Sequence, residues 1–362
     1  MKKTWLKAAG LCLAVSLIFG GCASSGNTAE NAAKAEARVI TDEGGNQVEL
    51  PEKITKVAIT PIPWASAVWT IDGGSGRIVS INPSAMAQYK KSFMTKLAPE
   101  FADISTGEIS QDFSINIEEL MKLSPEVAFI WNDQEAEAEK LKAVGITPVM
   151  LNYAENLENL KKDLALVGKV LDKEDFTQEL IDYHNDTETY FTNKKDMTAA
   201  ADQKSVLYLQ NNKLSVAGSK NINNYLLELT GGRNVAAGLE KKWAEVNMEQ
   251  IMEWNPEIIY LSNFDDTKPE DLYENKIEGQ DWSNIDAVKN HRVYKTPVGT
   301  LRWDAPCVET PLMLKWMGSI QQPEIFSDYD IRSDIKDFYK KFFNHDLTDE
   351  EIDTIYNVKV NQ

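Results

Sequence analysis

Cysteine is scarce in this chain of 362 residues, where it occurs only as Cys12, Cys22 and Cys307. The first two lie in or just after an apolar N-terminal run, so Cys307 alone remains for a folded domain. A framework of disulfide bonds is therefore excluded, even if the compartment is oxidising. The stability of the fold must come from packed hydrophobic cores.

Histidine is equally scarce, with only His184, His291 and His345. A site for bare zinc or manganese needs several imidazoles that converge with a carboxylate. We expect the first in a long helix, the second at a turn before a strand and the third near the C-terminal helix. These positions do not converge, so no metal ligands are predicted, and a Ser-His-Asp arrangement has few possible members.

Sequence motifs of common enzymes are missing as well. The stretch Gly73-Gly74-Ser75-Gly76 lacks the spacing of a hydrolase nucleophile elbow and is typical of a turn. Neither a zinc-protease helix motif nor a phosphate-binding loop occurs. No catalytic residue is predicted, and the chain is not expected to be an enzyme.

An excess of basic residues is also lacking, since the formal net charge is −18. Loss of the N-terminal leader described next would remove three lysines and no acids, which takes the charge to −21. A surface this acidic repels nucleic acid and anionic lipid. Nucleic acid is therefore excluded as a partner.

The chain begins with features of an export signal. Three lysines precede an apolar run at Ala8–Phe19, which is too short to span a bilayer. The sequence Phe19-Gly20-Gly21-Cys22 then resembles a lipobox. We predict a signal peptide at 1–21, a diacylated Cys22 and a solvated tether at 22–37. The alternative is an ordinary signal peptide followed by a chance cysteine.

The most informative feature is an internal repeat. Residues 115–132 align without a gap onto residues 246–263, at a constant offset of 131 positions. The identical pairs are Asn116 and Asn247, Glu118 and Glu249, Met121 and Met252, Pro125 and Pro256, Glu126 and Glu257, and Asn132 and Asn263.

Both copies of the repeat predict the same local structure. Asn116 and Asn247 are good N-caps, and Glu119 and Gln250 occupy the capping-box position three residues later. A proline then ends each short helix, and an apolar run of strand character follows at 127–131 and 258–261. Two such units predict two α/β lobes related by pseudo-twofold symmetry.

Further apolar runs complete the predicted fold. Strands are expected at 56–60, 78–81, 147–151, 206–209 and 292–295, alternating with helices, which favours mostly parallel sheets. An amphipathic helix covers 157–171, and a second stretch from Asp175 to about Lys195 holds neither glycine nor proline. We therefore predict two Rossmann-like lobes joined by a single long α-helix, with a ligand cleft between them. The predicted boundaries are 38–171, 172–197 and 198–362.

At this point the chain resembles a known family. The matching segments are Val39–Asp42, Val48–Pro51 and Lys56–Ile59 at the start, and Val298–Pro306 followed by Glu309 and Leu312 near the end. They are similar to class III solute-binding lipoproteins of ABC importers for ferric siderophores, haem or vitamin B12. The resemblance implies a monomeric, extracytoplasmic, membrane-anchored protein that has no cofactor of its own. Its ligand would be a metal chelate, delivered to a permease dimer with its ATPase.

The resemblance also implies two docking residues. In that family each lobe carries a glutamate that pairs with permease arginines, two residues after the asparagine that starts the short helix. Glu118 and Glu249 match this position. The simpler explanation is that an acid in a first helical turn favours the helix dipole and needs no partner.

Loops that follow the strands are expected to line the cleft, because ligands bind there in such architectures. Flat aromatic side chains suit macrocycles and catecholates, and an arginine suits a propionate, phosphate or carboxylate. If the ligand is haem, Met86 or Tyr89 could supply an axial ligand. The predicted contacts are Trp64, Ser84, Met86, Tyr89, Trp131, Lys213, Trp243, Arg302 and Trp303.

Two other functions stay open at this point. A ligand-sensing lipoprotein that signals to a membrane partner would have the same kind of site. A chelatase or lyase built on the same lobes is a second alternative, since a fold does not dictate an activity.

Overall fold

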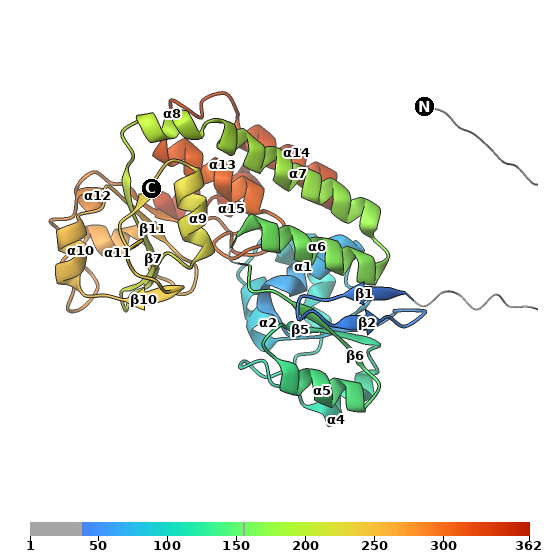
Figure 1. Ribbon diagram of the computed structural model, residues 1–362. Coiled ribbons are helices and arrows are strands. Elements are labelled where there is room, and N and C mark those ends of the chain that lie inside the picture. Colours follow the sequence, from blue (N-terminus) through green and yellow to red (C-terminus); the bar gives the residue numbers. More distant parts are fainter. Residues whose placement is uncertain (1–37, 155) are drawn as a thin grey trace, which may run out of the picture. The chain divides into compact units, whose positions relative to one another are not determined.

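The computed structural model describes residues 38–154 and 156–362, and it contains two mainly parallel β-sheets, each covered by helices (Figure 1). The predicted signal peptide, Cys22 and the tether at 22–37 lie outside the described residues. The predicted α/β architecture with two lobes is confirmed by this arrangement.

The first sheet has the strand order β4-β3-β5-β6, and all its neighbours are parallel. A two-stranded antiparallel ribbon, β1–β2, precedes it. The strands predicted from the sequence are all present. Their bounds are β1 Val39–Thr41, β2 Gln47–Glu49, β3 Val57–Ile59, β4 Ile78–Ile81, β5 Val127–Trp131 and β6 Thr147–Leu151.

The second sheet repeats the same parallel core. Strand β7 pairs with β11, which pairs with β12, and β9 lies on the other side of β7. Two antiparallel strands, β8 and β10, extend it. The bounds are β7 Ser205–Asn211, β8 Ser215–Ala217, β9 Arg233–Asn234, β10 Trp243–Glu245, β11 Ile258–Leu261 and β12 Val293–Lys295.

Helices cover both faces of each sheet. In the N-terminal lobe they are α1 Ile62–Asp72, α2 Pro83–Tyr89, α3 Met94–Leu97, the 3-10 helix η1 Pro99–Asp103, α4 Ile117–Leu123, α5 Glu135–Ala143 and α6 Leu157–Leu171. The later helices are α7 Glu174–Asn193, α8 Lys195–Ala200, α9 Ile222–Leu229, α10 Met248–Trp254, α11 Pro269–Tyr273, α12 Asp286–Lys289, α13 Thr310–Gln321, α14 Ile331–Phe343, α15 Asp349–Ile355 and α16 Val358–Asn361.

Alternate strand residues face different helical layers, as expected for buried strands. Val127 and Phe129 of β5 point into an inner core that includes α1 and α6. Ala128 and Ile130 point into a separate outer core with α4 and α5. The second sheet divides in the same way, because Ile258 and Tyr260 join the inner core and their neighbours join another outer core with α10, α11 and α12.

The inner core is continuous from one lobe to the other, whereas each outer core belongs to one lobe alone. The described residues accordingly form one compact unit. Burial of large apolar side chains is the main stabilising term in such a core. The two lobes are thus fastened to each other by the same packing that holds each of them together.

The sequence repeat is confirmed as a structural repeat. Helices α4 and α10 begin and end at positions related by the offset of 131, and each ends in a left-handed residue, Ser124 or Asn255. The side chain of each capping asparagine accepts a hydrogen bond from the N–H three residues later. The prediction that Glu119 and Gln250 complete a capping box is wrong. The Glu119 carboxylate instead accepts a hydrogen bond from Lys122, and the Gln250 amide donates to Glu253.

The repeated glutamate has a structural role that is the same in both lobes. A Glu126 oxygen accepts hydrogen bonds from the backbone N–H groups of Thr55 (3.1 Å) and Lys56 (2.6 Å), just before β3. A Glu257 oxygen accepts from the N–H (2.9 Å) and the hydroxyl (3.1 Å) of Ser205, at the start of β7. Each carboxylate therefore satisfies donors at the beginning of the neighbouring central strand.

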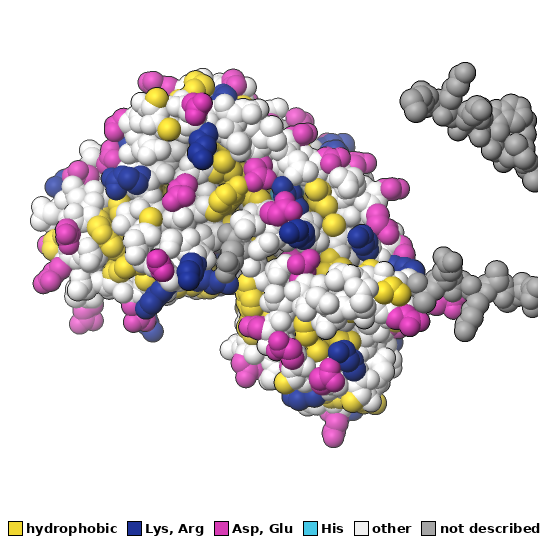
Figure 2. Space-filling model, viewed as in Figure 1, with side chains coloured by type: hydrophobic (Ala, Val, Ile, Leu, Met, Phe, Trp, Pro, Cys, Tyr) yellow, Lys and Arg dark blue, Asp and Glu magenta, His cyan; other side chains and the backbone are white. Residues whose placement is uncertain are grey.

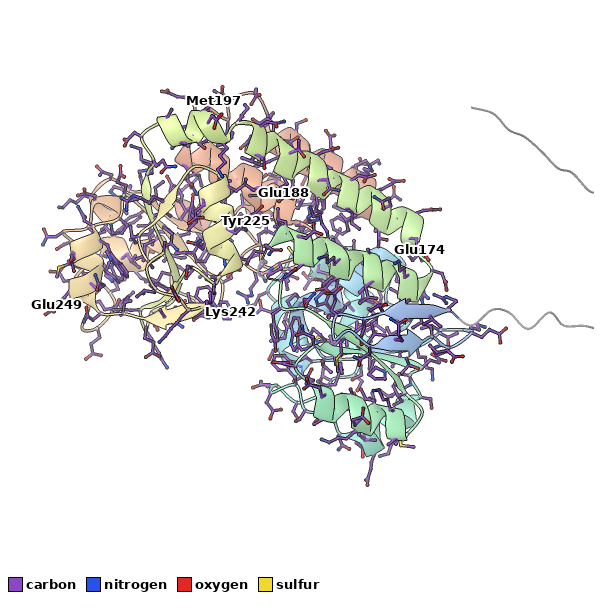
Figure 3. The ribbon with its side chains drawn as sticks, viewed as in Figure 1. Glu174, Glu188, Met197, Tyr225, Lys242 and Glu249 are labelled. Atoms are coloured by element: carbon purple, nitrogen blue, oxygen red, sulfur yellow. The ribbon has the colours of Figure 1, made fainter. Side chains whose placement is uncertain are left out.

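Helix α7 packs against α6 of the first lobe and α13 of the second. It also carries a polar bridge, in which Glu188 accepts hydrogen bonds from Lys161 of α6 (2.9 Å) and Tyr225 of α9 (2.6 Å; Figure 3). The backbone N–H of Phe93 donates to the Gly299 carbonyl of the other lobe at 2.9 Å. The lobes are thus connected at several points besides the long helix, which restricts their relative motion.

We predict that Glu257→Ala lowers the free energy of unfolding by about 2 kcal/mol and Glu126→Ala by about 1 kcal/mol. The larger effect is expected for Glu257→Ala because its partner Ser205 is buried, whereas Thr55, a partner of Glu126, is exposed. Urea unfolding at neutral pH measures both, with the exposed Glu174→Ala as control. Equal effects of the two variants would contradict the argument from burial.

The same two carboxylates are expected to make a contribution to the free energy of unfolding that is lost in acid. Burial raises the pKa of each, but the hydrogen bonds outweigh it, so the pKa of Glu126 and that of Glu257 lie below the usual value. Their contribution is complete above the unfolded pKa and is lost as the pH falls through the folded pKa. The gap in stability between each variant and the wild type should therefore begin to narrow as the pH falls below the unfolded glutamate pKa of about 4.3, and it should close below the folded pKa.

Candidate functional site

A pocket with a volume of about 360 Å³ opens between the carboxyl ends of the two parallel sheets. The space-filling view shows that the surface is indented where the lobes meet (Figure 2). Both lobes contribute, as expected for ligand sites of open α/β sheets. The lining residues are Ile62, Pro63, Trp64, Trp131, Asn152, Tyr153, Ala154, Lys220, Asn221, Ile222, Asn223, Lys242, Trp243, Phe264, Leu301, Arg302, Asp304, Ala305 and Pro306.

The wall from the N-terminal lobe is aromatic. The Trp131 and Tyr153 rings stack with their centroids 4.1 Å apart, at the ends of β5 and β6. Trp64 adds a third ring from the first turn of α1. The buried Trp131 Nε1–H has no hydrogen-bond acceptor among the described residues, so it is a donor that the fold itself does not use.

The wall from the C-terminal lobe combines rings with a guanidinium. Trp243 and Phe264 meet edge to face at 5.7 Å, and the Arg302 guanidinium lies 3.6 Å from the Phe264 ring centroid. Phe264 is 47% exposed and Tyr153 is 37% exposed, which is unusual for large aromatic side chains in this structure. The two walls therefore present flat faces to the space between them.

Arg302 is held by an acid of its own loop. Its Nη1 donates to Asp304 at 2.7 Å, and the same carboxylate oxygen accepts a hydrogen bond from the Ser262 hydroxyl. The buried Arg302 Nε and the second Asp304 oxygen have no hydrogen-bond partner among the described residues. The ion pair fixes the orientation of the guanidinium and neutralises part of its charge.

Two lysines add positive charge to the pocket. Lys220 is exposed and precedes α9, whereas Lys242 reaches from the C-terminal lobe over the Tyr153 ring of the other lobe, 4.7 Å from its centroid. Together with Arg302 they give three cationic side chains, and Asp304 is the one acid among the lining residues that the structure describes. These cations are notable in a chain whose formal net charge is −18.

Two helices begin at the pocket. The first turns of α1 and α9 supply lining residues, and neither turn carries an acidic side chain. The N-terminus of a helix bears a partial positive charge, which favours an anion. Pro63 has no N–H, and the N–H groups of Trp64 and Asn223 already bond Pro61 and Asn221. Helix geometry and lysine charge therefore act in the same direction.

Behind the wall lies a buried acid. The Asp163 carboxyl of α6 accepts hydrogen bonds from the backbone N–H of Asn152 at 3.1 and 3.2 Å, and Asn152 itself lines the pocket. Burial raises the pKa of Asp163 to about 8, the Asn152 bond opposes the rise, and the Glu43 carboxylate adds to it. Asp163 therefore carries a proton at neutral pH.

The structure brings four of the predicted ligand contacts to the pocket, namely Trp64, Trp131, Trp243 and Arg302. It places the other five elsewhere. Met86 and Tyr89 of α2 are buried in the inner core, where the Tyr89 hydroxyl donates to the Ala98 carbonyl. Ser84 lies in the first turn of α2, Lys213 in the exposed β7–β8 turn and Trp303 in the core, with no exposed surface.

Sequence reasoning missed Tyr153, Lys220, Lys242 and Asp304. One signal was available: Asn221 is a good N-cap, and the apolar positions after it have helical spacing, which would have put Lys220 at the start of a helix. No local signal marks Lys242 or Asp304. Both residues reach the pocket only because the fold brings together segments that are distant in the sequence.

The three histidines lie apart. His184 is buried in α7 with its Nε2 near the Val308 carbonyl (3.1 Å), His291 precedes β12 and His345 is near Glu351. Burial lowers the pKa of His184 to about 4, although the Val308 bond opposes this, so it is neutral at neutral pH. Within residues 38–154 and 156–362, no cluster of three or more His, Cys, Asp or Glu side chains that could hold a metal ion is found.

The predicted docking residues lie outside the pocket. Glu118 is exposed on α4 and Glu249 is exposed on α10. Figure 3 shows Glu249 on the side of the C-terminal lobe away from Lys242, which is at the pocket. In the described part of the chain neither glutamate forms an ion pair, and no helix could cross a membrane.

Comparison with known proteins now identifies the family. The family model described as periplasmic binding protein matches residues 78–298. The chain belongs to this family. It is therefore an extracytoplasmic solute-binding protein of the ABC transporter type, which works with a permease and an ATPase and binds a small molecule.

Individual members of the periplasmic binding protein family agree with the assignment. A solved periplasmic solute-binding protein from Veillonella parvula is 47% identical, with a TM-score of 0.85 over 90% of this chain and 98% of that one. The molybdate-binding protein MolA of Haemophilus influenzae is 26% identical over 84% of this chain and 91% of its own length. The haem uptake protein IsdE of Staphylococcus aureus is 26% identical over 52% of this chain and 65% of its length.

Asp163 predicts a distinctive pH dependence of stability. Its folded pKa lies above its unfolded value, so the folded state gains from the bound proton, and this gain is lost as the pH rises from about 4 to about 8. Asp163→Asn keeps an acceptor for the Asn152 N–H and removes the titration. We expect the variant to gain stability relative to the wild type as the pH rises, by about 1.4 kcal/mol for each pH unit between about 4 and 8.

Thermal unfolding of both proteins from pH 4 to pH 9 measures this difference, and the exposed Asp196→Asn serves as control. Parallel curves for the wild type and Asp163→Asn would show that the Asp163 carboxyl titrates normally in the folded protein.

Proposed function

We propose that this protein captures an anionic metal chelate with flat, aromatic parts and delivers it to its ABC importer. The observation that carries the proposal is the composition of the pocket: five aromatic rings from two lobes surround a site whose described lining includes the cationic side chains of Lys220, Lys242 and Arg302. Rings favour an organic surface and the cations favour an anion. An anionic ferric siderophore combines both properties.

The size of the pocket is compatible with such a ligand. A volume of about 360 Å³ lies at the lower end of the range for small-molecule sites. A compact chelate can fill it, whereas haem or a corrinoid would need the lobes to move apart. Because the inner core joins the lobes, we expect only modest opening.

A molybdate-type oxyanion is the second candidate. Lys220, Lys242 and the N-termini of α1 and α9 favour any anion, and MolA, a relative over most of the chain, is a molybdate-binding protein. A small oxyanion, however, would leave the five rings without a partner. The aromatic walls therefore favour a chelate over a bare oxyanion.

Delivery requires a docking surface and a place at the membrane. We propose that Glu118 and Glu249 pair with basic residues of the permease, since both are exposed and belong to the repeat. We also propose that Cys22 carries a lipid anchor, which keeps the protein close to the importer. Charged rim contacts of this kind favour correct orientation with modest affinity.

The ligand class is tested by thermal stabilisation of the purified protein with a ferric catecholate, a ferric hydroxamate, haem, cobalamin and molybdate. A ligand at 100 times its Kd adds about 2.7 kcal/mol of stability. We expect the ferric catecholate to give the largest rise in Tm. A rise with molybdate alone would replace the chelate by the oxyanion, and chemical conversion of any chelate would support an enzyme instead.

Arg302→Ala should weaken an anionic ferric catecholate roughly 10- to 100-fold and a neutral ferric trihydroxamate much less. The variant removes one positive charge and leaves the Asp304 carboxylate without its ion-pair partner, so that it repels an anion. Fluorescence titration gives both affinities, and Lys213→Ala is a control outside the pocket. Equal weakening of the two chelates would mean that Arg302 only supports the structure.

Glu118→Ala combined with Glu249→Ala should leave ligand affinity unchanged and reduce uptake by whole cells at least roughly tenfold, as expected for loss of two charge pairs. Glu174→Ala is the matched control, because Glu174 is an exposed glutamate in the first turn of another helix (Figure 3). Loss of ligand affinity in the double variant would contradict the separation of docking from binding.

A further inference from the structure

Exposed large apolar side chains are few in this structure, and two of them occupy equivalent positions of the repeat. Met121 of α4 is 48% exposed and Met252 of α10 is 42% exposed. Two more exposed apolar residues, Tyr153 and Phe264, line the pocket, so exposure there has a functional reason. The two methionines lie outside the pocket.

The two methionines do not contribute to the cores. In each of these short helices the fully buried residue is the one before the methionine, Leu120 or Ile251. The pattern of buried and exposed positions along α4 and α10 is the same at every residue. Full burial of a large apolar side chain stabilises a protein by about 1.5–3 kcal/mol. Met121 and Met252 occupy the same position of the repeat, and neither gains this stabilisation in full.

Each methionine lies next to a predicted docking glutamate. Met121 follows Glu118 by three residues and Met252 follows Glu249 by three, so each pair shares one helix face. We call Glu118 with Met121 the α4 patch, and Glu249 with Met252 the α10 patch. Each patch joins an apolar group to a carboxylate that has no ion pair in the described part of the chain.

We propose that the α4 and α10 patches form a two-point docking surface in which Met121 and Met252 bury against two equivalent subunits of the importer permease. The inference rests on the function proposed above and adds an apolar contact to it. A partner with two equivalent surfaces suits two equivalent patches. Methionine is flexible and adapts to irregular surfaces, while the neighbouring carboxylates require basic groups on the partner.

The chain offers a matched control for this proposal. Met197 of α8 is 54% exposed, as exposed as the other two, but it is not part of the repeat and α8 lies apart from α10 (Figure 3). A general effect of removing an exposed methionine would appear at all three positions. A docking effect would appear at Met121 and Met252 alone.

Contact is tested by cross-linking on intact cells that express the full chain with Met121→Cys, Met252→Cys or Met197→Cys. Burial raises the pKa of the Cys307 thiol, so a maleimide reacts at the new surface cysteine. A benzophenone maleimide attached there should form an adduct with the membrane-spanning subunit of an ABC importer from positions 121 and 252 only. An equal yield from position 197, or an adduct only with a second copy of this chain, would overturn the proposal.

Glu118→Cys and Glu249→Cys separate failure of this inference from failure of the docking assignment. Permease adducts from the glutamate positions without any from the methionine positions would refute the apolar contact and leave the proposed function intact. No permease adduct from any of the four positions would refute docking through α4 and α10 altogether, and with it the present inference.

The energetic contribution is then measured with the importer identified by that adduct, reconstituted in proteoliposomes. Met121→Gln with Met252→Gln should raise the Kd for the full chain roughly tenfold or more, since two buried apolar contacts are lost. Met197→Gln should leave the Kd unchanged. An unchanged Kd for the double variant would show that the methionines do not bury on docking.

Discussion

The continuous inner core is the constraint on which the rest of this structure depends. It contains the inward-facing residues of both sheets and the helices between them, whereas each lobe keeps a separate outer core. Because interiors are packed as densely as crystals, a shared core resists large rotations of one lobe against the other. The bridge from Lys161 through Glu188 to Tyr225 ties α6, α7 and α9 together in the same layer. The pocket therefore lies between walls whose positions are nearly fixed, and a ligand pays little for ordering them.

Charge is distributed in two opposite ways in this protein. Acidic side chains are scattered over the visible face (Figure 2), yet the described residues that line the pocket include three cations and one acid. At physiological salt, charges farther away than about 8 Å are largely screened, so the acidic exterior repels an anion only weakly. Lys220, Lys242 and Arg302 act at short range, where a site with apolar walls strengthens electrostatic attraction. An acidic exterior is thus compatible with the proposed binding of an anion in the pocket.

The repeat shows how one local unit serves several purposes. Its asparagine caps a helix of seven residues, its glutamate binds the start of the central strand, and its strand divides the inner core from the outer one. A helix this short is not stable by itself, so its position depends on the cap and on one buried residue. The cap and this buried residue fix which face of the helix is exposed, which suits the docking role that we propose for it.

Much of the fold followed from the amino-acid sequence alone. Caps, prolines and apolar periodicity are local signals, and they predicted the strands, the helix pair α6 and α7, and the repeat that implies two lobes. The pocket was predicted only in part, because the side of a loop that faces the cleft is not encoded locally: Arg302 lines the pocket while its neighbour Trp303 is fully buried. Met86 and Tyr89 look equally suitable in the sequence, but α2 turns them into the core. Lys242 lines the site because tertiary packing brings this residue, just before β10, over Tyr153 of the other lobe. The two residues are about ninety positions apart, so no local sequence pattern predicts their contact.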